Sequence, residues 1–292
     1  MANRKLHLRF PFLLLLTGLL LSGCAFFRNS HKPLRIQRWA CYYGSDSTLL
    51  SQLPRYDLVV VEPDHAGVKP PADAKTLYAA YLSIGEAEKF RWYWSEVERM
   101  DGVVLYQNGN WKDDWFVDIR KAAWQDFLIT RVIPKIIDQG YRGLFFDTID
   151  SPLFLEADDP RKFSGSADAV TAFVKRVRET FPDLILISNN GLAILNRIAP
   201  YVNALTVESL NTTFRFSDKQ YLRTPSELRN QRLQWLANAA ETLRGKPVLV
   251  IDYMAPGQHD LADYSRTECA RLGFIPFQAE IGLHSLPPEI AP

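Results

Sequence analysis

The sequence lacks an excess of charge of either sign and lacks the common nucleotide-binding and serine-hydrolase motifs. Over 292 residues the formal net charge is +1, so the chain has no electrostatic footprint for nucleic acid. Blocks of like charge, internal repeats and low-complexity tracts are also absent. No G-x-S-x-G elbow, P-loop or pair of histidines at metal-ligand spacing occurs. We therefore expect no cofactor, no metal and no nucleic-acid partner.

The sequence has one long apolar run, and it lies near the N-terminus. Basic residues precede the segment 10–21, which is too short to favour a spanning helix. The Leu-Ser-Gly-Cys24 that follows resembles a bacterial lipobox, which implies a signal peptide at 1–23, a lipid on Cys24 and a linker at 24–34. An ordinary cleaved signal peptide and an uncleaved anchor are the alternatives. Because Ala25 rather than Asp comes next, we expect a lipid-anchored envelope protein on the outer membrane, facing the periplasm or the exterior.

Cysteine is scarce in the rest of the chain, where only Cys41 and Cys269 occur. An oxidising envelope would permit a disulfide between them. A disulfide needs Cα atoms less than about 7 Å apart, and nothing in the sequence places these two that close. We expect two separate buried thiols.

Apolar segments alternate with helix-like segments through residues 35–292. A hydrophobic content of 47% allows a sizeable core, and the length suits one large α/β domain or two small ones. The alternation predicts a (β/α)8 TIM barrel with a weak or missing last helix, and an open doubly wound sheet is the alternative. We expect strands at 35–41, 57–61, 77–84, 144–146, 184–188, 204–207, 248–251 and 274–277.

Helices are expected between most of these strands, at 47–53, 121–139, 167–180, 226–243 and 260–272, with another ending at Ile198. Pro134 is expected to kink the second of these. Residues 87–118 form a long aromatic-rich excursion with a short helix at 95–100. Loops are expected at 151–164 and 209–225. Loops of such length are usually functional.

Acidic side chains stand at the carboxyl ends of these strands. In the stretch 140–150 a Gly-bounded turn leads into an apolar run that ends at Asp147, and Asp150 follows. The carboxyl ends of barrel strands converge on one rim. For any one of these residues the plainer interpretation is a turn cap or an ion pair, as with Asp118 and Arg120. The rim set is Glu62, Glu86, Asp118, Asp147, Glu208, Asp252 and Glu280.

Crowded carboxyl groups raise one another's pKa. Crowding therefore supplies a protonated acid beside an ionised base and also suits a cationic substrate. Such a pair is what cleavage of a glycosidic bond requires. Seven aromatic residues could offer flat faces to sugar rings, and at most half of them, chiefly those in loops, are expected to do so. The seven are Tyr42, Tyr43, Trp92, Trp94, Trp111, Trp115 and Tyr253.

Eight short motifs, in the order found here, resemble glycoside hydrolase family 114, the endo-α-1,4-polygalactosaminidases. This family includes the hydrolase domain of Pel polysaccharide enzymes. The resemblance covers residues 35–280. The motifs are YYG at 42–44, YDLVV at 56–60, YLSIGE at 81–86, VDIR at 117–120, GLFFD at 143–147, SNNG at 188–191, VES at 207–209 and IDY at 251–253.

The resemblance implies an endo-acting enzyme that cleaves α-1,4-linked galactosamine in an exopolysaccharide, as in a biofilm. It implies Asp147 as the nucleophile and Glu208 as the acid/base. Partly deacetylated galactosamine is cationic, in agreement with an acidic rim. At Glu62 family members more often carry an Asp. Residues expected to contact the substrate are Tyr42, Glu62, Glu86, Asp118, Arg120, Asp150, Asn189, Asp252, Tyr253 and Glu280.

Two other functions fit the same residues. One is a non-catalytic envelope lipoprotein that binds the polysaccharide in the same site. The other is a glycosidase for a neutral α-galactoside. The sequence does not indicate an oligomeric state.

Overall fold

The computed structural model describes residues 34–65 and 69–287, which belong to one compact unit, Pro33–Pro292. The expected signal peptide, Cys24 and all of the linker except Leu34 lie outside the described residues. Within those residues, no helix combines the length and apolar character needed to cross a membrane.

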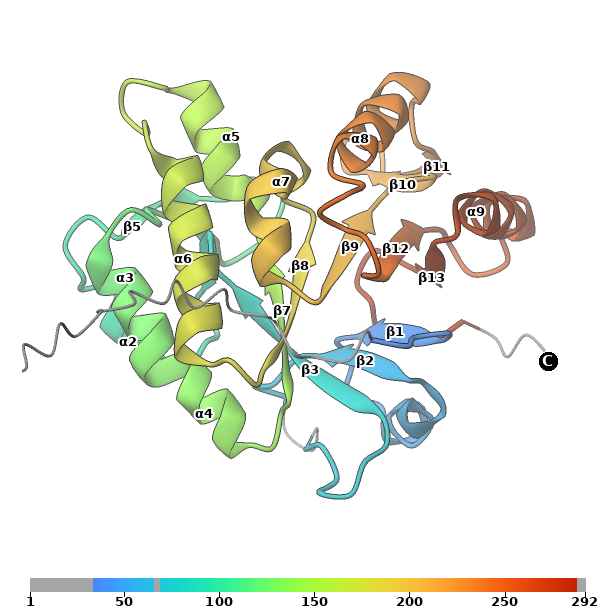
Figure 1. Ribbon diagram of the computed structural model, residues 1–292, viewed down its shortest axis with the longest axis horizontal. Coiled ribbons are helices and arrows are strands. Elements are labelled where there is room, and N and C mark those ends of the chain that lie inside the picture. Colours follow the sequence, from blue (N-terminus) through green and yellow to red (C-terminus); the bar gives the residue numbers. More distant parts are fainter. Residues whose placement is uncertain (1–33, 66–68, 288–292) are drawn as a thin grey trace, which may run out of the picture. The chain divides into compact units, whose positions relative to one another are not determined.

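Eight parallel strands form a sheet that is nearly closed into a barrel (Figure 1), in the order β1-β2-β3-β7-β8-β9-β12-β13. At the closing edge the Trp39 indole Nε1 donates to the Ile275 carbonyl oxygen at 2.9 Å. The (β/α)8 prediction is confirmed, and each expected strand has a counterpart. Their bounds are β1 Trp39–Tyr42, β2 Leu58–Val61, β3 Leu77–Ser83, β7 Gly143–Asp147, β8 Ile185–Asn189, β9 Ala204–Glu208, β12 Val248–Tyr253 and β13 Ile275–Ala279.

The strands are buried on both faces, as the apolar runs predicted. All four residues of β2 are fully buried, which is typical of a parallel sheet covered by helices. In α6 (Ser166–Thr180) the buried residues Val170, Phe173, Val174 and Val177 recur at three- and four-residue spacing, so one stripe of the helix faces the core.

The remaining helices follow the prediction with shifted ends. They are α1 Ser47–Leu50, α2 Trp94–Val97, α3 Ala122–Phe127, α4 Ile133–Asp138, α7 Leu195–Ile198, α8 Ser226–Asn238 and α9 His259–Leu272. A π-helical turn at Leu128–Val132 divides α3 from α4, just before Pro134. Proline has no N–H to donate to the regular helical hydrogen-bond ladder. The helix is interrupted beside Pro134, where a kink was expected. In the described residues that follow β13, there is no helix.

Three expected loops contain regular structure, so the loop prediction was wrong there. The excursion forms an antiparallel sheet of β4 (Glu86–Glu88), β6 (Asp114–Val117) and β5 (Val104–Gln107), in that order. The expected loop at 209–225 contains the hairpin of β10 (Thr212–Arg215) and β11 (Gln220–Arg223). The expected loop at 151–164 is occupied in its first half by helix α5 (Asp150–Asp158). Strands of three or four residues are too short to show the alternation of apolar and polar residues by which a strand is recognised in a sequence. Pro152, which suggested a loop, lies in the first turn of α5, where proline is tolerated.

The two cysteines are separate, as expected. Cys41 on β1 and Cys269 on α9 are free and buried. The Cys269 Sγ accepts a hydrogen bond from Asn211 Nδ2 at 3.4 Å. Both thiols therefore belong to the packing of the barrel.

Candidate active site

A cavity of about 570 Å³ lies at the carboxyl ends of the barrel strands. Its lining includes Asp147 at the end of β7, Glu208 at the end of β9 and Tyr253 at the end of β12. Glu62, which follows β2, lies on the same wall. Barrel enzymes place their chemistry at this end of the strands, and the volume is within the usual range for a small-molecule site.

Asn189, the last residue of β8, connects the two carboxyl groups of β7 and β9. Its Nδ2 donates to Asp147 Oδ1 at 2.7 Å and to Glu208 Oε1 at 2.9 Å. Two oxygens that share one nitrogen at hydrogen-bond distance lie less than about 6 Å apart. The amide orientation follows from its partners, because the reverse orientation would place its oxygen against two carboxyl groups. The two acids therefore face one narrow gap.

A tyrosine also donates to each carboxyl group, Tyr81 to Asp147 and Tyr253 to Glu208. Burial raises the pKa of both acids, and the negative charge of Asp147 adds to that effect, so that the pKa of Glu208 is about 7. At Asp147 the hydrogen bonds from Asn189, the Thr148 N–H and Tyr81 oppose the rise in pKa, as those from Asn189 and Tyr253 do at Glu208. The two acids therefore titrate as a coupled pair, in which the charge of Asp147 favours the protonated form of Glu208.

The backbone turns in the same way after each of these three side chains. Thr148, Asn190 and Ser209 follow β7, β8 and β9 and have φ values of 59°, 56° and 54°. This left-handed conformation is uncommon for residues other than glycine and costs free energy at a β-branched residue such as Thr148. Thr148 Oγ1 offsets part of that cost by accepting from the N–H of Ile84 at 3.2 Å and of Gly85 at 2.8 Å.

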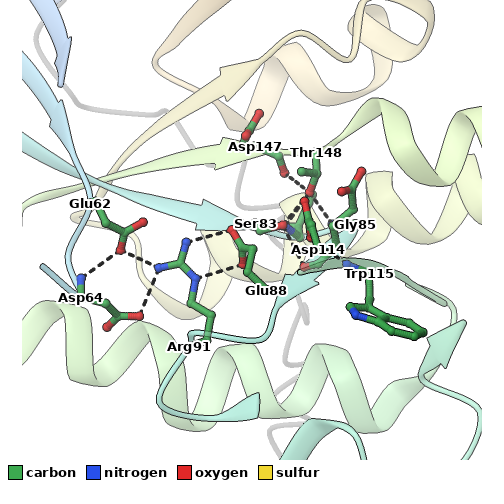
Figure 2. Close-up of polar contacts among 12 residues, drawn as sticks. Glu62, Asp64, Ser83, Gly85, Glu88, Arg91, Asp114, Trp115, Asp147 and Thr148 are labelled. Atoms are coloured by element: carbon green, nitrogen blue, oxygen red, sulfur yellow. Dashed lines mark hydrogen bonds and ion pairs between the residues drawn. The ribbon is translucent and has the colours of Figure 1, made fainter. Parts of the chain in front are cut away.

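A buried arginine neutralises part of the cavity wall. Figure 2 shows Arg91 between Glu62 and Asp64 on one side and Glu88 on the other. Its Nη1 lies 2.5 Å from Glu62 Oε1 and 3.1 Å from Asp64 Oδ2, and its Nη2 lies 2.9 Å from Glu88 Oε1. Glu62 and Glu88 are therefore held as ion pairs, and their charges are largely balanced within the protein.

A second pair of carboxyl groups on the same wall, Glu86 and Asp114, has neutral hydrogen-bond donors. Glu86 accepts from Asn108 Nδ2 at 2.9 Å and from the Ser151 hydroxyl, and it shares a hydrogen bond with Asp114. Burial and the adjacent Glu86 raise the pKa of Asp114 to about 9. Asp114 is therefore protonated at neutral pH.

Several residues expected to contact the substrate lie outside the cavity lining. Tyr42 is buried, with its hydroxyl accepting from the Asp46 N–H at 3.1 Å, and its neighbour Tyr43 lines the cavity instead. Asp118 and Arg120 form an ion pair at 2.8 Å. Arg120 Nη1 also donates to the carbonyl oxygens of Lys162 and Ser164, at 2.9 and 3.1 Å. This pair supports the loop before α6.

Three further acids that were expected to contact the substrate, Asp252, Asp150 and Glu280, have structural partners. Asp252 is completely buried and accepts from Asn211, the Thr212 N–H and the Ser265 hydroxyl, so it is closed to a substrate. Asp150 accepts from the Gly191 N–H at 3.1 Å. Glu280 accepts from the N–H groups of Gly282 and His284 and organises the turn after β13. Of the remaining expected residues, Glu62, Glu86 and Tyr253 line the cavity, and Asn189 lies between the two acids.

The sequence analysis missed residues supplied by the small sheet and by tyrosines inside strands. Glu88 and Asp114 line the cavity from β4 and β6. The alternation Glu86-Ala87-Glu88 places both glutamates on one face of β4, and this was the available signal. Tyr81 lies within β3 rather than at its tip, so its contact with Asp147 had no sequence signal. Further lining residues missed include Arg91, Asn108, Phe214 and Phe216.

Comparison with known proteins connects this geometry to a family. Residues 25–283 match the model of Glycoside-hydrolase family GH114. The chain belongs to family GH114. The resemblance seen in the sequence is thereby confirmed, and the protein is a glycosidase.

Solved structures agree with the GH114 assignment. The chain is similar to the glycoside hydrolase domain of PelA from Pseudomonas aeruginosa, with 27% identity and a TM-score of 0.71 over 86% of this chain and 98% of that domain. Ega3 of Aspergillus fumigatus, solved in complex with galactosamine, shares the fold at 13% identity, with a TM-score of 0.64 over 87% of this chain and 96% of that one.

Uncharacterised bacterial proteins also resemble this GH114 chain. One from Thermotoga maritima is 28% identical over 234 residues, which cover 74% of this chain and 69% of that protein. Another, from Deinococcus radiodurans, is 26% identical over 275 residues, which cover 88% of this chain and 85% of that protein.

Replacement of Thr148 by Val tests whether its hydroxyl supports the strained end of β7. Thr148→Val keeps the shape but leaves the Ile84 and Gly85 N–H groups without this acceptor. We expect the free energy of unfolding to fall by about 1–3 kcal/mol, measured by urea denaturation. Thr180→Val, at the exposed end of α6, is the matched control and should change stability little. Equal effects of the two substitutions would contradict this role.

Proposed function

We propose that this GH114 glycosidase is an endo-acting hydrolase of an α-1,4-linked, galactosamine-containing exopolysaccharide. In the proposal, Asp147 is the nucleophile and Glu208 the acid/base. The observation that carries it is the bridge from Asn189 Nδ2 to both carboxyl groups on the wall of an open cavity. The same proposal locates the enzyme in the cell envelope, where a lipid on Cys24 would hold it near an extracellular polymer.

The short gap between the acids supports a mechanism that retains anomeric configuration. A separation below about 6 Å fits the roughly 5–5.5 Å of retaining glycosidases better than the roughly 6.5–9.5 Å of inverting ones, which need room for a water. An ionised Asp147 beside a protonated Glu208 is the pair of states that such a reaction requires at its start.

The proposed reaction has two displacements. An Asp147 oxygen bonds to the anomeric carbon while the glycosidic bond breaks, and the Glu208 proton moves to the leaving oxygen. The sugar is then held as an ester of Asp147. In the second step the Glu208 carboxylate takes a proton from water as the water oxygen attacks the anomeric carbon. This releases the sugar and restores both carboxyl groups to their starting states.

The charge of the cavity supports a cationic substrate. Six acids and two basic residues, Arg91 and Lys112, line it, and Arg91 forms ion pairs with two of the acids, Glu62 and Glu88. Four carboxyl groups remain in two hydrogen-bonded sets, Asp147 with Glu208 and Glu86 with Asp114. Galactosamine units with free amines are cations, and an ammonium group near these acids would gain from their negative potential.

Amide variants of the two acids test the proposed roles. We expect Asp147→Asn and Glu208→Gln each to reduce oligosaccharide release from a galactosamine polymer at least about a hundredfold, because each removes a group that forms or transfers a bond. Glu241→Gln, at an exposed position on the surface, is the control and should keep full activity. Undiminished release by either cavity variant would disprove the role given to that residue. A wild-type protein that binds the polymer without cutting it would support the non-catalytic alternative.

Removal of each tyrosine hydroxyl should move one limb of the pH profile. Tyr253 lowers the pKa of Glu208 by donating to it, so Tyr253→Phe raises that pKa. Glu208 then stays protonated to higher pH, and the basic limb of kcat/KM moves up. Tyr81→Phe raises the pKa of Asp147 in the same way, which moves the acidic limb up instead, because Asp147 must be ionised.

The two tyrosine variants serve as controls for each other in a series of kcat/KM measurements across pH. A shift of the same limb in both variants, or no shift in either, would contradict the assignment of proton donor and nucleophile.

N-acetylation of the substrate separates the cationic from the neutral alternative. We expect a fully N-acetylated polymer to be cut at least about tenfold more slowly at low ionic strength, since its sugars carry no charge to pair with the acidic wall. Reducing-end release from matched acetylated and deacetylated chains measures this. Added salt should slow cleavage of the deacetylated chain only. Equal rates on both chains would favour a neutral α-galactoside as substrate.

A further inference from the structure

Three aromatic side chains gather on the surface beside the cavity. Tyr106 on β5 and Phe154 on α5 are 41% and 56% exposed. Phe116 on β6 lies between them, with ring centroids 5.2 Å from Tyr106 and 6.3 Å from Phe154. The rings of Phe116 and Phe154 are nearly parallel, at 27°. We call these three residues the aromatic strip. Exposed rings that cluster in this way mark binding surfaces more often than single exposed rings do.

The aromatic strip shares one face of the small sheet with the acids of the cavity wall. Residues two apart on a strand point to the same side, so Asp114 and Phe116 of β6 share a face, as do Glu86 and Glu88 of β4. In the antiparallel ladder Phe116 lies opposite Glu86, and Asp114 lies opposite Glu88. Cross-strand partners also share a face. One face therefore carries the acids and one ring of the strip.

Helix α5 joins the same two groups from the other side. The Ser151 hydroxyl donates to Glu86, and Phe154, one turn later, stacks on Phe116. Residues three apart on a helix lie on the same side. Two separate elements thus continue from the acidic part of the wall to the aromatic strip. The acids line the cavity, whereas the strip lies outside the cavity lining.

We propose that the aromatic strip is a second sugar-binding site, which holds galactosamine units of the same polymer after the chain leaves the catalytic cavity. This inference rests on the proposed function. A sugar ring has an apolar face of C–H groups that packs on an aromatic ring, and its ammonium group is attracted to the ring face and to nearby carboxylates. The strip shares a face of the small sheet with acids of the cavity wall, and Phe116 lies directly opposite Glu86. This arrangement matches a cationic chain that occupies both, which neither a lipid surface nor a protein partner would require.

Binding measured without cleavage tests the strip. The Asp147→Asn protein serves as the parent, and the probes are an α-1,4-galactosamine trisaccharide and a long oligomer. Phe154→Ala and Tyr106→Ala are added singly to the parent, and each alters an exposed side chain. We expect each to raise the Kd for the long oligomer about three- to tenfold. The Kd for the trisaccharide, which the cavity can hold alone, should change by less than about twofold.

Two control variants make the result specific. Phe154→Tyr keeps the ring and should bind the long oligomer like the parent. Leu228→Ala removes an exposed apolar side chain from α8, away from the strip, and should also bind like the parent.

Three outcomes would overturn the inference: unchanged binding of the long oligomer by both alanine variants, equal losses for the two probes, or a loss in Phe154→Tyr as large as in Phe154→Ala. If the parent itself binds neither probe, the proposed substrate is wrong and the inference falls with it. Binding by the parent that is insensitive to the strip removes the inference alone.

Discussion

The cavity depends on the contact between the Asn189 amide and two acids that would otherwise repel each other. Two buried carboxyl groups at this separation are unstable when both are ionised, and one Nδ2 atom offers each of them a hydrogen bond. A tyrosine adds one more hydrogen bond to each acid, Tyr81 to Asp147 and Tyr253 to Glu208. Neutral donors thus hold the two acids in position, and the pKa of both stays raised. A buried cation in the place of Asn189 would instead lower both pKa values and favour loss of the proton.

The parallel sheet is what allows one amide to reach both acids. β7, β8 and β9 are neighbours in the sheet, and each ends in a polar residue of the site followed by a residue with positive φ. The repeated turn directs the chain away from the rim directly after each functional side chain. Asn190 links two of these turns, because its Oδ1 accepts from the Glu208 N–H at 3.0 Å. Hydrogen bonds thus support the strained turns, between the β8 and β9 turns through Asn190 and from the β7 turn to Ile84 and Gly85 through Thr148.

The sequence predicted the barrel and its two central acids because both have local signals. An apolar run that ends in a carboxylate identifies a buried strand and its carboxyl end, as at Asp147 and Glu208. The same signal failed at Asp252, which also ends an apolar run but accepts hydrogen bonds from Asn211, Thr212 and Ser265 inside the fold. Of the neighbours Tyr42 and Tyr43, both named as possible sugar contacts, Tyr43 lines the cavity and Tyr42 is buried. Such distinctions depend on which distant segments supply donors, and no local pattern records them.

The cavity wall has two pairs of acids with different proposed roles. Glu86 and Asp114 would bind the charge of the substrate, and Asp147 and Glu208 would carry out the chemistry. Arg91 forms ion pairs with Glu62 and Glu88, and each of the two remaining carboxyl pairs contains an acid whose pKa is raised, Asp114 to about 9 and Glu208 to about 7. At Glu86 and Asp114 an ammonium group can take over the role of the Asp114 proton, since both acids only need a positive neighbour. At Asp147 and Glu208 the proposed mechanism requires the proton to remain, because in that mechanism the leaving oxygen receives it. A substrate amine is therefore useful beside the first pair and harmful beside the second, where it would lower the pKa of Glu208 and remove the acid. The distribution of cations and neutral donors along the wall thus favours a polymer that places its charge away from the bond it presents for cleavage.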